Sequence, residues 1–158
     1  MLLVIVDSLR ADRIGKLRSG RPVAPRLEAL ADQSTQFVSA YASFPGTSES
    51  VRAMVEGTYW PRADRRDAPL DLGAILENAG VARRAIIAHK NLGTALGDSF
   101  ELDARYVEER LPEGKKARTS ALVARATLDA LRRMVLGHER FVLASHFYDP
   151  HAHYVTNE

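Results

Sequence analysis

The chain opens with a continuous apolar run, Leu2 to Val6, in which apolar and polar residues do not alternate. Such a run predicts a strand buried on both faces, as in a parallel sheet covered by helices. Two later segments, Arg84 to His89 and Phe141 to Ser145, contain apolar runs of the same kind. The pattern therefore predicts a sheet with these segments in its interior.

Apolar residues at helical spacing lie between these runs. Helices are expected over Pro25 to Ala31, from Thr47 onward, over Leu70 to Asn78, and from about Thr119 to Leu136. The last of these is the longest. Its expected apolar face is made of Leu122, Ala126, Leu131 and Val135.

Three other segments complete the pattern. Thr35 to Ala42 is rich in aromatic and β-branched residues and is expected to form a strand. Pro61 to Asp67 is expected to be a charged loop, and Gly93 to Gly114 an irregular polar region. Strands that alternate with helices favour an α/β fold with a mostly parallel sheet and helices on both faces.

The composition excludes several classes of protein. The 158 residues suffice for one domain, and 46% apolar with 27% charged residues predicts a packed globular fold. A net charge of +2 gives no strong field, so nucleic acid is not an expected partner. The absence of cysteine excludes disulfides and thiolate chemistry but leaves the compartment open. The longest apolar run, Met1 to Val6, is far shorter than the roughly 20 residues of a membrane span, so neither a membrane segment nor a signal peptide is expected in this chain.

Polar side chains follow the predicted strands, at the edge where open parallel sheets collect ligands. Asp7 follows the first strand, His89 and Asn91 stand at the end of the second, and His146 and His151 follow the last. Carboxylates bind hard cations, and imidazoles serve as metal ligands, acids, bases or anion donors. These residues are the candidates for a site.

A second feature suggests what such a site does. Thr47 begins a predicted helix, where backbone N–H groups and the helix dipole favour an anion such as phosphate or sulfate. A cation on Asp7 would lower the pKa of the Thr47 hydroxyl and neutralise the anion. Imidazoles from the last loop would hold an oxyanion or protonate a leaving group. Together these residues outline a threonine nucleophile that attacks a phosphoester.

Each candidate also has a purely structural interpretation. Asp7 would equally cap a turn, Thr47 would more often be only a helix N-cap, and His89 and Asn91 are more often ordinary loop residues. The histidines near the end of the chain are harder to explain in this way. Three of the five histidines lie within eight residues, alongside one aspartate: His146, Asp149, His151 and His153.

Four segments, in this order, resemble the N-terminal part of the sulfatase family within the alkaline phosphatase superfamily. They are Leu2 to Asp12, Pro25 to Ala31, Thr47 to Ser50 with Gly57, and His146 to Tyr154. The resemblance spans nearly the whole chain. It implies an alkaline phosphatase-like α/β fold that is truncated at its C-terminus, with residues 1–158 forming the N-terminal part of a single catalytic domain.

The resemblance also implies a set of roles. The residues concerned are two metal ligands, Asp7 and Thr47, a catalytic pair, Thr47 and His151, and three substrate contacts, His89, Asn91 and His146. The implied cofactor is a divalent cation, either Ca²⁺, Mg²⁺ or Mn²⁺. The implied partner is an anionic small-molecule, lipid or glycan ester, and the family is compatible with a periplasmic or extracellular location of the full-length protein.

Departures from the family pattern decide which reaction is expected. Sulfatases convert the first residue of a Cys/Ser-x-Pro/Ala-x-Arg motif to formylglycine, but Thr47 stands there and threonine cannot give that aldehyde. A shift to Ser48 aligns Arg52 but places Ser50 where proline or alanine is expected. Ser8 stands where many sulfatases have a second metal-binding aspartate, and the Asp-Gly or Asp-His-Gly metal motif lies beyond the end of this chain.

The expected function is that of a metal-dependent phosphoester hydrolase or phospho-group transferase with a threonine nucleophile. The chain by itself is expected to be incomplete and inactive. Two alternatives stay open. One is a sulfuric ester hydrolase, which keeps the fold and changes the reaction, and the other is a non-catalytic α/β binding module that has lost its metal site.

Overall fold

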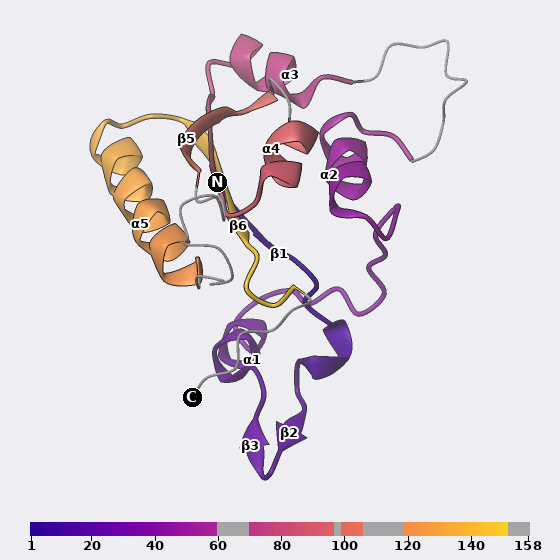
Figure 1. The fold of residues 1–158 in the computed structure, drawn as a ribbon. Coiled ribbons are helices and arrows are strands. Elements are labelled where there is room, and N and C mark those ends of the chain that lie inside the picture. Colours follow the sequence, from indigo (N-terminus) through magenta and orange to yellow (C-terminus); the bar gives the residue numbers. More distant parts are fainter. Residues whose placement is uncertain (60–69, 97–98, 106–118, 152–158) are drawn as a thin grey trace, which may run out of the picture. The chain divides into compact units, whose positions relative to one another are not determined.

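The fold is that of a computed structural model, shown in Figure 1, which describes residues 1–59, 70–96, 99–105 and 119–151. The chain divides into two compact units. Unit 1 consists of Met1–Asp7 and Ala42–Glu158, and unit 2 of Ser8–Tyr41. The charged loop predicted over Pro61 to Asp67 lies outside the described residues.

A four-stranded sheet forms the centre of unit 1. Its strands are β1 (Leu2–Val6), β6 (Phe141–Phe147), β4 (Ala82–Ile87) and β5 (Glu101–Arg105), in the spatial order β1-β6-β4-β5. All three pairings are parallel. The three predicted strands are thus confirmed, with boundaries shifted by about two residues in β4 and β6. The predicted burial on both faces is wrong for β1, which lies at an edge among the described strands and leaves Leu2 and Val4 exposed.

Helices cover both faces of this sheet. On one face lie α2 (Thr47–Val55), α3 (Leu72–Asn78) and α4 (Lys90–Leu96), and on the other lies α5 (Ser120–Leu136) (Figure 1). Successive strand residues point to opposite faces, so β4 supplies Ile87 to the first core and Ile86 to the second. The predicted α/β architecture is confirmed.

The predicted inner face of α5 is half right, since Ala126 and Leu131 pack against the core but Leu122 and Val135 do not. Leu122 and Val135 are 48% and 59% exposed, and the buried stripe is instead Val123, Thr127, Ala130 and Met134. Both stripes have helical spacing, and periodicity alone favours the one with the larger apolar side chains. Contact with the sheet instead turns Thr127 inward, because its hydroxyl forms a hydrogen bond of 2.8 Å with the buried hydroxyl of Ser145 on β6.

The segment from Gly93 to Gly114 is also more regular than predicted. It includes most of α4, which buries Leu92 and Leu96, and the whole of β5. The strand was hidden because β5 alternates charged residues with the partly buried Leu102. Charges are typical of a strand at the edge of a sheet, which is where β5 lies among the described strands.

Unit 2 contains a short 3₁₀ helix, η1 (Ala11–Arg13), the predicted helix α1 (Pro25–Ala31), and a small antiparallel pair, β2 (Leu17–Arg18) and β3 (Arg21–Pro22). The strand predicted over Thr35 to Ala42 is wrong. Its apolar side chains are exposed and no described strand pairs with it. Strand propensity reflects packing on a half-buried sheet, and this segment pairs with none of the strands that the structure describes.

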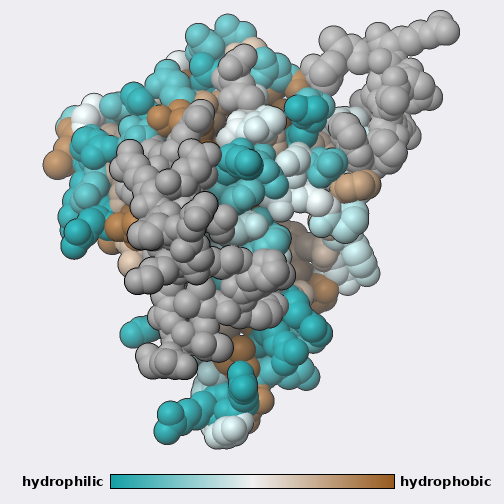
Figure 2. Space-filling view, in the orientation of Figure 1, coloured by the Kyte–Doolittle hydropathy of each residue, from teal (hydrophilic) through white to brown (hydrophobic). Residues whose placement is uncertain are grey.

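Some apolar surface of unit 1 is exposed. Leu2 and Val4 of β1 are 41% and 51% exposed, and β1 has β6 as its one partner among the described strands. Exposed hydrophobic residues also lie along α5, at the left of Figure 2. None of the described helices is long and apolar enough to cross a membrane.

Candidate functional site

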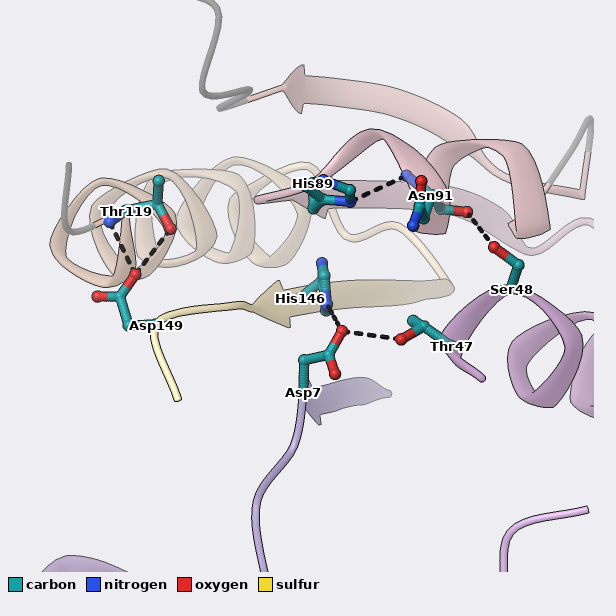
Figure 3. Close-up of polar contacts among 8 residues, drawn as sticks. All are labelled: Asp7, Thr47, Ser48, His89, Asn91, Thr119, His146 and Asp149. Carbon is teal, nitrogen blue, oxygen red and sulfur yellow. Dashed lines mark hydrogen bonds and ion pairs between the residues drawn. The ribbon is translucent and has the colours of Figure 1, made fainter. Parts of the chain in front are cut away.

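The register of β1 against β6 places Asp7 beside His146. Ile5 is paired with His146, and one step beyond the strand the Asp7 N–H donates to the Phe147 carbonyl at 2.9 Å. Because side chains alternate along a strand, Asp7 points to the same face as Ile5 and His146. The result is a contact of 3.4 Å between His146 Nε2 and Asp7 Oδ2 (Figure 3).

Thr47 approaches the same carboxylate oxygen from α2. Its hydroxyl Oγ1 donates to Asp7 Oδ2 at 3.0 Å (Figure 3). The helix N-cap is Gly46, not Thr47, and glycine has no side chain to cap this end. The interpretation of Thr47 as a mere N-cap is therefore wrong, because its hydroxyl is engaged with Asp7 and not with the helix backbone. The sheet and α2 together bring Thr47, Asp7 and His146 to one point, as expected for residues at the carboxyl edge.

Ser48 faces a different part of the site. Consecutive helix residues point about 100° apart, so Thr47 and Ser48 cannot both face Asp7. Ser48 Oγ instead donates to the backbone carbonyl of Asn91 at 3.4 Å. The Asn91 N–H in turn donates to Nδ1 of His89 at 3.3 Å (Figure 3). His89 and Asn91 thus lie where β4 passes into α4, next to the start of α2.

His89 and His151 are joined by a residue that the sequence reasoning did not single out. The ring of Tyr148 lies between them, 4.6 Å from His89 and 4.5 Å from His151, with interplanar angles of 11° and 15°. His146 meets the same tyrosine edge to face at 5.9 Å. Stacked rings limit rotation, so Tyr148 restrains two candidate imidazoles at once. The available signal was an aromatic residue inside the histidine cluster.

His146 is the most buried of these side chains, with 1% of the residue exposed. Burial lowers its pKa below the usual histidine value, and the nearby Asp7 carboxylate only partly opposes this effect. The imidazole is therefore neutral at pH 7. Among the described residues, its Nδ1 has no hydrogen-bond partner.

Asp149 has a structural role within the histidine cluster. Its carboxylate accepts hydrogen bonds from the Thr119 and Ser120 N–H groups at 2.9 and 3.1 Å and from the Thr119 hydroxyl at 3.0 Å. Burial raises the pKa of Asp149, but these hydrogen bonds outweigh burial and hold it below the usual range. Asp149 thus caps the start of α5 and anchors the loop that carries Tyr148 and His151.

Replacing Asp149 by alanine is expected to lower the free energy of unfolding by about 2 kcal/mol at pH 7, at the upper end for the loss of a helix cap. The native pKa is depressed, so this contribution is complete above the unfolded pKa of 3.8 and is lost as the pH falls through the lower native value. Urea unfolding of both proteins at pH 7 and at successive values below 3.8 measures it. An equal difference at every pH would contradict the capping role, and Asp129→Ala, an exposed carboxyl on α5, is the control.

The oxygen atoms where Asp7 meets Thr47 are of the type that a hard divalent cation binds. Asp7 offers a carboxylate and Thr47 a hydroxyl, and Ca²⁺, Mg²⁺ and Mn²⁺ prefer oxygen ligands. In the part of the chain that the structure describes, no group of three or more His, Asp or Glu side chains could hold a metal ion. The described residues thus supply part of a ligand set. His153 lies outside them.

Comparison with known proteins supports the fold and identifies the family. A solved structure with a similar fold is a protein in the alkaline phosphatase superfamily from Vibrio parahaemolyticus, determined to 1.95 Å, with a TM-score of 0.71 at 20% identity. The match covers 99% of this chain and 42% of that one, so this chain spans less than half the length of that protein. Among curated protein sequences nothing matches. The family model described as Sulfatase matches residues 1–158, and the chain therefore belongs to the sulfatase family.

Proposed function

We propose that the chain forms the N-terminal part of a metal-dependent phosphoester hydrolase or phospho-group transferase that uses Thr47 as its nucleophile. The observation that carries the proposal is the hydrogen bond of 3.0 Å from Thr47 Oγ1 to Asp7 Oδ2. It places a hydroxyl at the start of a nine-residue helix and against a carboxylate. Membership of the sulfatase family supports an ester of an oxygen-rich anion as the substrate.

Different residues of this chain would have different roles in such a reaction. Backbone N–H groups in the first turn of α2 would attract the anionic substrate, because Gly46 at the N-cap has no side chain that could bond to them. Asp7 accepts the hydroxyl proton of Thr47 in a hydrogen bond and so aims the oxygen at the substrate. Asp7 and Thr47 would hold a divalent cation with further ligands from outside the described residues. When bound, that cation supplies positive charge that lowers the hydroxyl pKa and neutralises the anion.

In the covalent step, Thr47 Oγ forms a bond to phosphorus as the bond from phosphorus to the leaving alcohol breaks. His151 donates a proton to the departing oxygen, and the Thr47 proton passes to Asp7 Oδ2, which accepts its hydrogen bond. Water then releases phosphate from Thr47 in a hydrolase, or an acceptor alcohol takes the phospho group in a transferase. His89 and Asn91 would contact the anion beside the start of α2.

Replacing His151 by phenylalanine is expected to lower kcat by roughly 10²–10⁴-fold for substrates with poor leaving groups and far less for good ones. Phenylalanine keeps a ring against Tyr148 but has no proton to give. The measurement is a plot of log kcat against the pKa of the leaving alcohol for both proteins. If kcat falls by the same factor for every leaving group, His151 binds the anion and does not act as the acid. His138→Phe, at an exposed histidine after α5, is the control.

The nucleophile is tested by mass spectrometry of the protein trapped with a phosphodiester substrate. A phosphorylated peptide that contains Thr47 is the expected result. A formylglycine mass change at Ser48 would instead favour a sulfuric ester hydrolase. The contact of Ser48 with the Asn91 carbonyl, away from Asp7, supports Thr47. A protein that neither forms an adduct nor binds Mn²⁺ would correspond to a non-catalytic binding module.

A further inference from the structure

His146 stands apart from the other histidines of the site in its burial. It is 1% exposed, and the side chain of Asp7 against which it lies is only 9% exposed. A ring buried to this degree offers almost no surface to a substrate. It does reach Asp7 Oδ2, which lies 3.4 Å from its Nε2 and is the same oxygen that accepts the Thr47 hydroxyl (Figure 3).

The surroundings of the ring select one tautomer. A carboxylate oxygen can only accept a hydrogen bond, so the nitrogen that faces it must carry the proton. That nitrogen is Nε2. In the neutral ring Nδ1 then keeps a lone pair, and it is the one buried side-chain N or O atom among the described residues without a hydrogen-bond partner. With Nδ1 protonated instead, two lone pairs would face each other and a buried donor would be unsatisfied, which costs about 1–3 kcal/mol.

We propose that His146 is a positioning residue, which donates from Nε2 to Asp7 Oδ2 and fixes the carboxylate in the orientation that receives Thr47 and a cation. This role rests on the proposed function of Asp7 and Thr47. A buried neighbour that orients a metal ligand is commonly needed for full metal affinity. His146 therefore acts on the reaction through Asp7 and not by contact with the substrate.

Two substitutions separate this role from simple filling of space. The amide nitrogen of glutamine in His146→Gln reaches the position of Nε2, whereas that of asparagine in His146→Asn reaches only the position of Nδ1. We expect the Gln variant to bind Mn²⁺ within about threefold of the wild-type Kd, and the Asn variant on the order of 10–100-fold more weakly. Equal Mn²⁺ affinities of the two variants, measured by titration calorimetry, would overturn the proposal.

A second measurement needs no substitution at His146. In ¹H–¹⁵N NMR spectra of the full chain, the imidazole proton of His146 is expected on Nε2, in slow exchange with water, and shifted upfield in Asp7→Ala. A proton on Nδ1, or a chemical shift of this proton that is unchanged in Asp7→Ala, would overturn the positioning role. If wild-type protein binds no Mn²⁺, the cation part of the proposed function fails, and the location of this proton still decides the role of His146.

Discussion

Replacing Thr47 by alanine is expected to lower turnover of a phosphoester by 10³-fold or more, on the order expected when a nucleophile is removed. The free energy of unfolding should fall by only about 1 kcal/mol, because the helix keeps its Gly46 N-cap and the substitution removes the hydrogen bond from the Thr47 hydroxyl to Asp7. A large effect on rate with a small one on stability is the signature of a reacting group.

Matched variants make the test of Thr47 specific. Thr47→Ser keeps the hydroxyl and should retain part of the activity, whereas Thr47→Val keeps the shape without the hydroxyl and should behave as Thr47→Ala. The measurements are kcat and KM in the complete enzyme, and unfolding in urea. Full activity of Thr47→Val would defeat the proposed nucleophile. Normal activity of Ser48→Ala is the expected control result, since Ser48 faces Asn91.

Replacing Asp7 by asparagine is expected to have the second largest effect. The amide oxygen would still accept the Thr47 hydrogen bond, so the site should keep its shape. The negative charge would be gone, and a hard cation binds a neutral amide far less tightly than a carboxylate. Mn²⁺ affinity should fall by more than the roughly 10–100-fold that loss of a supporting neighbour causes.

Added metal provides the decisive measurement for Asp7. If Asp7 is a ligand, high concentrations of Mn²⁺, Mg²⁺ or Ca²⁺ should partly restore the turnover of Asp7→Asn, because mass action compensates for the weaker binding. The comparison is a titration of activity against metal for both proteins, with calorimetry for Kd. Identical titration curves would remove Asp7 from the metal site. Asp12→Asn, an exposed carboxyl paired with Arg10, is the control.

The sequence by itself determined the framework of this protein. The apolar runs that became β4 and β6 show little alternation because helices cover both faces of the sheet at these strands. Asp7 directly follows β1, and His146 lies one residue before the end of β6. Parallel strands end at a common edge, so the meeting of Asp7 and His146 could be expected from the sequence, whereas Thr47 follows no described strand and is brought there by α2. The roles of these residues in a reaction stay predictions.

Only the tertiary structure decided the details that depend on contacts between distant residues. The register of β6 against β1 places His146 beside the end of β1, whereas His151 lies after β6 and shares stacking on Tyr148 with His89. In the same way Asp149 proves to be the cap of α5. A local pattern shows which residues share a face or follow a strand. It does not show which side chain from elsewhere in the chain meets them, because that depends on how strands and helices pack in three dimensions.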